Sequence, residues 1–182
     1  SKLVGDRGRV LAFEPGGVAF RDLRRNIELN RAVNVHAFNL ALSDHAGPAR
    51  LFHSEDGPVA YSLEPGGGPD VGYEQVATTT LDDVSRELQI ERVDLIKLDV
   101  EGAEESALRG ANALLGRDQP VVLFEALPRD PRRPGRDHDG AWRLLRDRGY
   151  RLFAVDEHGR FVPRDHAQVG NNIALPRTWH EG

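Results

Sequence analysis

The most informative segment of this sequence is Val93-Asp94-Leu95-Ile96-Lys97-Leu98-Asp99-Val100-Glu101-Gly102-Ala103-Glu104. Apolar residues are concentrated between Val93 and Val100, and acidic residues and a glycine follow at once, as in a buried parallel strand that ends at a sheet edge. Open α/β sheets bind their ligands at the carboxyl ends of such strands. The segment therefore predicts an α/β fold with acidic side chains at a ligand-binding edge.

Asp99 and Glu101 lie two residues apart in this segment. If the extended conformation continues through Val100, both side chains project in the same direction over the edge. The structural alternative is the acidic first turn of a helix, which the helix dipole stabilises. We favour a functional interpretation for Asp99 and Glu101. For Glu104 and Glu105 we favour the structural one, because acidic residues mostly lie on the surface.

Length and composition favour one globular domain. The chain has 182 residues, of which 39% are hydrophobic and 29% charged, and no apolar run approaches the length of a membrane span. The net charge of -5 argues against nucleic acid as a partner. The absence of cysteine excludes disulfides, thiolate catalysis and thiolate metal sites.

The start of the sequence is unusual. There is no methionine in the chain, and Ser1-Lys2-Leu3-Val4-Gly5 is typical of the last turn of a helix that a glycine ends. We therefore expect residues 1–182 to form a single domain that is incomplete at its N-terminus.

The remaining segments predict alternating strands and helices. Two further apolar strands end in an acid, Val10–Phe13 before Glu14 and Val121–Phe124 before Glu125. Other strands are expected at 35–40, 75–79, 150–155 and 171–175, with a small hairpin or a pair of extended segments over 49–63. Helices are expected at 18–30, from Thr80 onward, at 103–115 with Gly116 as the stop, and at 141–148. Residues 64–69 and 128–139 are expected to be loops, and the second is a candidate lid.

Six motifs occur in order along the chain: Ala12-Phe13-Glu14-Pro15; Asn26 with Asn30; Ala41-Leu42-Ser43-Asp44; Thr79-Thr80-Leu81-Asp82-Asp83; Ile96-Lys97-Leu98-Asp99-Val100-Glu101-Gly102-Ala103-Glu104; and Asn171-Asn172-Ile173-Ala174-Leu175-Pro176. Together they resemble the FkbM-type S-adenosylmethionine-dependent methyltransferases over essentially the whole chain. The resemblance implies a Rossmann-like class I methyltransferase sheet of seven strands with an antiparallel final pair. It also implies that the first strand and its glycine-rich turn, at the centre of the sheet, are missing here. We expect roughly 20–40 further residues upstream, about one βα unit.

The resemblance gives the acidic strand ends their roles. Glu14 is expected to accept hydrogen bonds from the cofactor ribose, and its structural alternative is a surface acid that caps the next helix. Ser43 and Asp44 are expected near the adenine, although these two could be ordinary turn residues. Asn39 is a weaker candidate for the same role. Asp99 is expected beside the transferred methyl group.

Methyl transfer to a hydroxyl requires alignment of the acceptor and removal of its proton. Asp99 and Glu101 are the candidates for these roles, and Glu125 is expected to join them from the neighbouring strand. A divalent cation held by Asp99 and Glu101 is an alternative, which we do not favour because only two close carboxylates are visible. Lys97 is expected to form an ion pair rather than to react.

The sequence thus predicts a cytoplasmic methyltransferase that uses S-adenosylmethionine. It is expected to O-methylate a small-molecule or glycan acceptor, such as a sugar, glycan or natural-product hydroxyl. The alternatives are a nicotinamide-dependent oxidoreductase and a catalytically inactive Rossmann-like binding module. The sequence identifies neither the acceptor nor the oligomeric state.

Overall fold

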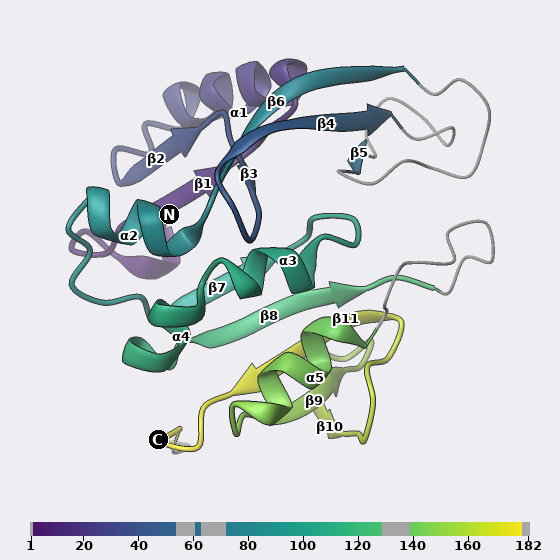
Figure 1. The fold of residues 1–182 in the computed structure, drawn as a ribbon. Helices are drawn as coiled ribbons and strands as arrows, with labels where there is room; N and C mark the ends of the chain where they lie inside the picture. Colours follow the sequence, from purple (N-terminus) through teal and green to yellow (C-terminus); the bar gives the residue numbers. More distant parts are fainter. Residues whose placement is uncertain (1, 54–60, 63–71, 129–138, 180–182) are drawn as a thin grey trace.

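The computed structural model of the chain describes residues 2–53, 61–62, 72–128 and 139–179 (Figure 1). It has a mixed α/β architecture, as the sequence predicts. The loop expected at residues 64–69, and most of the one expected at 128–139, lie outside the described residues. Within the described part, no helix is both long and apolar enough to cross a membrane.

The chain begins with a βαβ unit. A short 3-10 helix, η1 (Lys2–Val4), precedes β1 (Val10–Phe13), α1 (Gly17–Leu29) and β2 (Val35–Phe38). The two strands pair in parallel over their whole length, and the rings of Phe13 and Phe38 stack with their centroids 5.1 Å apart. These elements confirm the predicted strand, amphipathic helix and strand.

A five-stranded sheet contains the segment around Asp99. Its order is β10-β9-β11-β8-β7, with β7 (Leu95–Leu98), β8 (Val121–Ala126), β9 (Arg151–Val155), β10 (Phe161–Pro163) and β11 (Gly170–Leu175). Strands β7 and β8 pair in parallel, whereas β11 is antiparallel to both β8 and β9. The antiparallel end of the sheet therefore agrees with the prediction.

A second sheet of four strands was not predicted as a unit. It has the order β3-β6-β4-β5, with β3 (Ala41–Leu42), β4 (Gly47–His53), β5 (Tyr61–Ser62) and β6 (Tyr73–Thr79). The antiparallel pair β4–β5 confirms the expected hairpin. The long pairing of β4 with β6 joins segments separated by a loop, so local patterns could not reveal it. Figure 1 shows β4 and β6 as an elongated ribbon.

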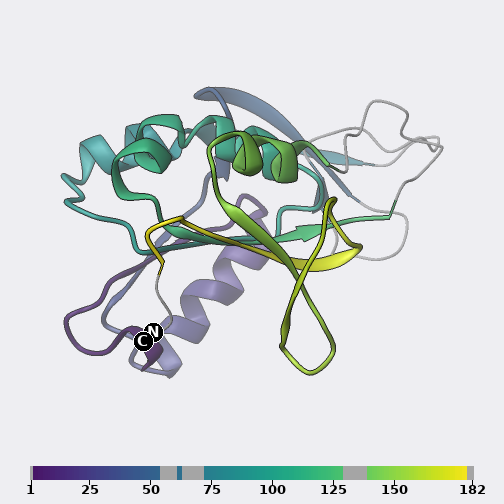
Figure 2. The same cartoon turned by 90° about the horizontal axis from the view of Figure 1, so that it is seen from below.

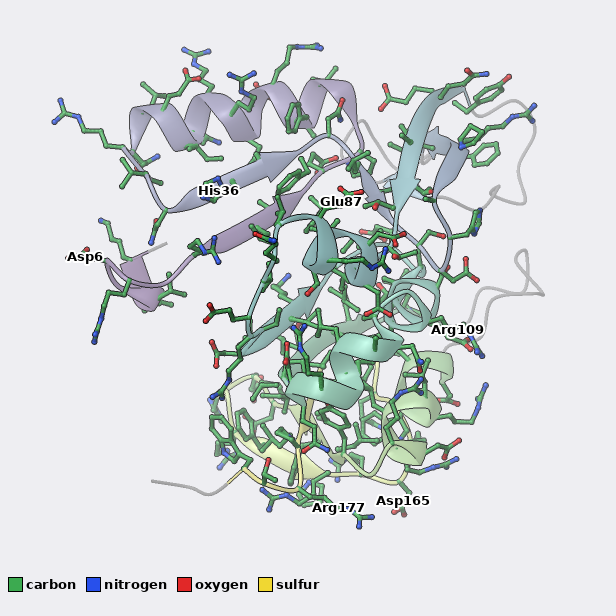
Figure 3. All side chains as sticks on the ribbon, turned by 60° about the vertical axis from the view of Figure 1, so that its left-hand side comes forward. Asp6, His36, Glu87, Arg109, Asp165 and Arg177 are labelled. Atoms are coloured by element: carbon green, nitrogen blue, oxygen red, sulfur yellow. The ribbon has the colours of Figure 1, made fainter. Side chains whose placement is uncertain are left out.

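The helices lie on two sides of the strands. Four short helices, α2 (Leu81–Glu87), α3 (Glu104–Arg109), α4 (Asn112–Asp118) and α5 (Gly140–Asp147), cover one face, and α1 lies on the other (Figure 2). Under the four helices is the main core, in which Leu98, Phe124 and Trp142 are almost fully buried and Phe13 of β1 is packed against the cluster. Its side chains fill the space between helices and strands in the lower half of Figure 3.

The helix predicted over residues 103–115 is in fact two helices. The helical conformation is interrupted between α3 and α4. Gly116, the expected stop, lies inside α4. The break has a tertiary cause, because the backbone N–H of Asp82 donates to the carbonyl of Gly110 at 2.9 Å. The Asp82 carboxylate then accepts the N–H groups of Ala113 and Leu114, each at 2.9 Å, and caps the second helix. Helical periodicity alone therefore could not predict the interruption between the two helices.

Candidate active site

The predicted site residues gather where the parallel strands end. β1 is parallel to β2 and β7 is parallel to β8, and Figure 1 shows β2 and β8 running towards the same side of the molecule. Glu14, Asn39 and Asp99 directly follow three of these strands, and Glu125 is the second-last residue of β8. The edge expected to bind a ligand therefore carries the expected polar groups.

Glu14 lies in a tightly held turn between β1 and α1. Its Oε1 accepts the backbone N–H of Gly16 at 2.8 Å, and its own N–H donates to the carbonyl of Phe38 at 3.0 Å. The Asn39 side chain donates from Nδ2 to the carbonyls of Glu14 (2.9 Å) and Pro15 (2.8 Å). Asn39, which follows β2, thus holds the turn that contains Glu14 through its side chain.

A residue that the sequence analysis missed also reaches this turn. Glu74 of β6 accepts the N–H of Gly17 through its Oε1 at 3.0 Å. Gly17 is the first residue of α1, whose N-cap Gly16 has no side chain with which to cap the helix. Because Glu74 is 57 positions away in sequence, no local pattern could have revealed the contact.

Ser43 and Asp44 follow β3 and contact α3. The Ser43 side chain is buried, and its hydroxyl lies 3.2 Å from that of Ser106. The N–H of Asp44 donates to the same Ser106 hydroxyl at 3.2 Å, and its Oδ1 lies 2.6 Å from Nδ1 of His45. This contact with His45 lowers the pKa of Asp44, against the opposing effect of partial burial. Asp44 thus presents an ionised carboxylate near the surface.

The expected geometry of Asp99 and Glu101 is wrong in one respect. β7 ends at Leu98, and Glu101 has a φ of 54°, so the chain turns instead of continuing as an extended strand. The side-chain directions are therefore not set by strand alternation. Glu104 stabilises the turn, since its Oε1 accepts the N–H groups of Val100 (3.2 Å) and Gly102 (3.3 Å).

That role confirms the structural interpretation of Glu104 but not its expected surface position. Only 6% of Glu104 is exposed. The neighbouring Glu105 pairs with Arg109 one helical turn later, on the side of α3 where Arg109 is seen in Figure 3.

Asp99 and Glu125 form a carboxyl pair with their pKa values moved in opposite directions. Lys97 donates from Nζ to Asp99 Oδ2 at 2.7 Å, which confirms that Lys97 forms an ion pair. The Lys97 hydrogen bond holds the pKa of Asp99 below its ordinary value, with a smaller contribution from a hydrogen bond with Glu125. Burial raises the pKa of Glu125, and the hydrogen bond to Asp99 and the nearby charges of Asp99 and Glu101 raise it further. Of the two acids, Asp99 thus loses its proton more readily than usual and Glu125 less readily.

The motif at residues 171–176 lies beside Glu125 at this edge of the sheet. Asn171 of β11 lies opposite Glu125 in the antiparallel register. The fully buried Asn172 donates to the carbonyls of Gln168 (2.8 Å) and Gly170 (2.9 Å) and accepts the N–H of Gln168 at 3.0 Å. Its amide thereby fixes the turn that leads into the strand.

The alternative of a divalent cation held by Asp99 and Glu101 concerns the same position. The described residues contain no group of three or more His, Asp or Glu side chains arranged to hold a metal ion.

Comparison with known proteins identifies the family. Residues 1–152 match the model of the methyltransferase FkbM domain. The chain belongs to the FkbM methyltransferase family. Among similar proteins, methyltransferase sdnD of Sordaria araneosa is 32% identical to this FkbM-family chain over 138 residues, or 58% of this chain and 52% of the relative.

A solved structure supports the fold of this FkbM-family chain. The crystal structure of methyltransferase FkbM from Methylobacillus flagellatus KT matches 92% of the chain with a TM-score of 0.52 and 18% sequence identity. The chain covers 36% of that structure and about half of the sdnD sequence.

Proposed function

We propose that this FkbM-family chain is an S-adenosylmethionine-dependent methyltransferase that transfers the methyl group to a hydroxyl oxygen of a sugar, glycan or natural product. The observation that carries the proposal is the turn at Glu14. Oε1 of Glu14 is bonded to the turn itself, and no described residue hydrogen-bonds to Oε2. A carboxylate oxygen in this position is suited to accept hydrogen bonds from the hydroxyl groups of a ribose.

The other residues predicted to contact the cofactor either have a polar group available for it or hold the neighbouring loops. Asn39 uses its amide nitrogen to hold the turn, and its carbonyl oxygen can accept a further hydrogen bond. Asp44 offers a carboxylate to the adenine, whereas the Ser43 hydroxyl contacts Asp44 and Ser106 and thereby holds the loop. Asp99 would lie next to the reacting methyl group.

S-adenosylmethionine, when bound, supplies a methyl group on a positively charged sulfur that is already activated for transfer. The residues of the chain must therefore orient the acceptor, exclude water and take up the hydroxyl proton. Asp99, kept ionised by Lys97, is suited to orient the acceptor hydroxyl, and Glu101 is a second candidate for that role. Glu125 in its ionised form is the better proton acceptor near neutral pH, because its pKa is raised.

A divalent cation held by Asp99 and Glu101 is the alternative way to activate the acceptor hydroxyl. Activity of the intact protein after treatment with a chelator distinguishes the two. Full activity supports proton transfer to a carboxylate, and a loss that added Mg²⁺ restores supports the cation.

We also propose that a further parallel strand, supplied by residues outside 1–182, completes the sheet between β1 and β7. Among the described residues, β1 pairs only with β2 and β7 only with β8. Each backbone group left unpaired in a buried position costs about 1–3 kcal/mol, so two open parallel edges that share a core favour an inserted strand. We further expect the protein to act in the cytoplasm.

The test is methyl transfer by the intact protein. We expect label from methyl-labelled S-adenosylmethionine to enter a hydroxylated acceptor in a panel of sugars, glycans and natural products. Glu125→Gln should lower kcat by about 100-fold or more while cofactor affinity stays within about threefold. Glu157→Gln, at an exposed position, is the matched control.

Two outcomes would contradict the proposal. Cofactor binding without transfer to any hydroxyl would support an inactive binding module. Hydride transfer with a nicotinamide cofactor would support an oxidoreductase.

A further inference from the structure

The first turn of α1 is held by two carboxylates from different parts of the fold. The first N–H groups of a helix have no partner within it, and the N-cap Gly16 cannot supply a side-chain acceptor. Glu14 accepts the N–H of Gly16 at 2.8 Å, and Glu74 accepts that of Gly17 at 3.0 Å. The helix dipole favours negative charge at this end, so both carboxylates are stabilised there.

The direction of Glu74 is imposed by the ribbon that carries it. Glu74 lies opposite Leu51 in the pairing of β4 with β6, and Leu51 is 2% exposed. Side chains alternate along a strand, so Glu74 points to the same inner face as Leu51. Its neighbours Tyr73 and Gln75 are exposed on the outer face, where the Arg50 guanidinium lies over the Tyr73 ring at 4.7 Å.

This contact affects what Glu14 can do. A single carboxylate that had to satisfy two adjacent N–H groups would have less acceptor capacity left for a ligand. Because Glu74 accepts the N–H of Gly17, Glu14 uses only Oε1 for the turn, and Oε2 has no hydrogen-bond partner among the described residues. The division of the two N–H groups between the two acids therefore presets the ribose-binding oxygen.

We infer that Glu74 is a positioning residue for the cofactor site, through which the β4–β6 ribbon fixes the turn at Glu14 in its binding conformation. The inference rests on the proposed function, because it concerns the affinity of the same turn for S-adenosylmethionine. Glu74 does not touch the cofactor in this account and acts only through Gly17 and Glu14.

The experiment compares Glu74→Ala and Glu74→Gln in the intact protein, with Gln75→Ala as the control on the outer face of the same strand. Loss of a helix-capping acceptor costs about 1 kcal/mol, so Glu74→Ala should raise the Kd for S-adenosylmethionine about fivefold with kcat at saturation unchanged. The amide oxygen of glutamine can still accept the Gly17 N–H, so Glu74→Gln should bind within about twofold of the wild type.

A second measurement does not need the cofactor. Hydrogen exchange of peptides covering residues 14–20 should be faster in Glu74→Ala than in the wild type, and unchanged in Glu74→Gln and Gln75→Ala. Equal affinity and equal exchange in Glu74→Ala and the wild type would overturn the inference while leaving the proposed function intact. Absence of S-adenosylmethionine binding by the wild type would overturn both, and faster exchange in Glu74→Ala would then show only a structural contact.

Discussion

At the residue scale, Lys97 controls the charge of the carboxyl pair Asp99 and Glu125. Its ammonium group is 2.7 Å from Asp99 and lowers the pKa of Asp99, whereas burial and the neighbouring acids raise the pKa of Glu125. A nearby positive charge favours the ionised form of both acids. The acid limb of the pH–activity profile therefore reports the pair and not one residue.

We predict that Lys97→Met moves the acid limb of kcat/KM to higher pH, because loss of the positive charge raises the pKa values of the pair. The measurement is the pH profile of methyl transfer by the intact protein. Arg92→Met is the control. Arg92 forms an ion pair with Asp94 at 2.9 Å, and Asp94 lies immediately before β7, at the end of the strand opposite to Asp99. Superimposable profiles for Lys97→Met and the wild type would contradict the assigned role.

Tyr150 is a second residue whose environment leads to a prediction. Its hydroxyl is buried with no hydrogen-bond partner among the described residues, and burial raises the pKa of Tyr150 from 10.0 to about 12. An unpaired buried hydroxyl costs about 1–3 kcal/mol. Tyr150→Phe should therefore leave the free energy of unfolding unchanged or increase it by about 1 kcal/mol.

The sign of the pH effect follows from the raised pKa. The folded state retains the phenolic proton that the unfolded state loses above pH 10, so this group lowers wild-type stability as the pH rises from 10 to about 12. Tyr150→Phe should lose less stability over that interval. Urea unfolding at several pH values measures both effects, and a loss of more than 1 kcal/mol at neutral pH would show that the hydroxyl has a partner.

At the element scale, the break between α3 and α4 depends on a close approach of Gly110 to the loop after β3. A Cβ atom at Gly110 would lie 2.0 Å from the carbonyl oxygen of Ser43, although the φ of −72° is ordinary for any residue. The requirement for glycine is therefore steric. Since this loop carries Asp44, the contact also sets the position of a proposed adenine-binding residue.

We predict that Gly110→Ala destabilises the protein by about 1–3 kcal/mol, the usual cost of overpacking. Gly116→Ala is the matched control, because nothing lies within 4 Å of its Cβ position and the residue is inside α4. There, alanine should stabilise the helix by about 0.5–1 kcal/mol. Chemical denaturation measures both, and equal effects of the two substitutions would refute the steric explanation.

The elements also show what the sequence could predict. Thr80, from which a helix was expected, caps α2 by accepting the Asp83 N–H at 2.9 Å, and the buried strand around Ile96 and Leu98 is where periodicity placed it. Such signals are local. The cap that Asp82 supplies to α4 and the contact of Glu74 with α1 join distant segments, so single-sequence patterns could not show them. In the candidate site, the residue types at strand ends were predictable, but the turn at Glu101 was not.

At the scale of the whole molecule, the two open strand edges are the most informative feature. If a strand fills the position between β1 and β7 in the intact protein, the backbone amides of these strands that face the gap become hydrogen-bonded. We predict slow hydrogen exchange in intact-protein peptides that cover residues 10–13 and 95–98, comparable with β8. Rapid exchange there would show that the edges stay open.

The central claim is that the turn at Glu14 binds S-adenosylmethionine. Its most direct test is calorimetric titration of the cofactor into the intact protein, its Glu14→Ala variant and Glu28→Ala, an exposed control on α1. A hydrogen bond to a charged group contributes about 1.5–3 kcal/mol, so Glu14→Ala should weaken binding by about 10–100-fold, with Glu28→Ala unchanged. Binding by Glu14→Ala as tight as by the wild type, or no binding by the wild type, would contradict the account.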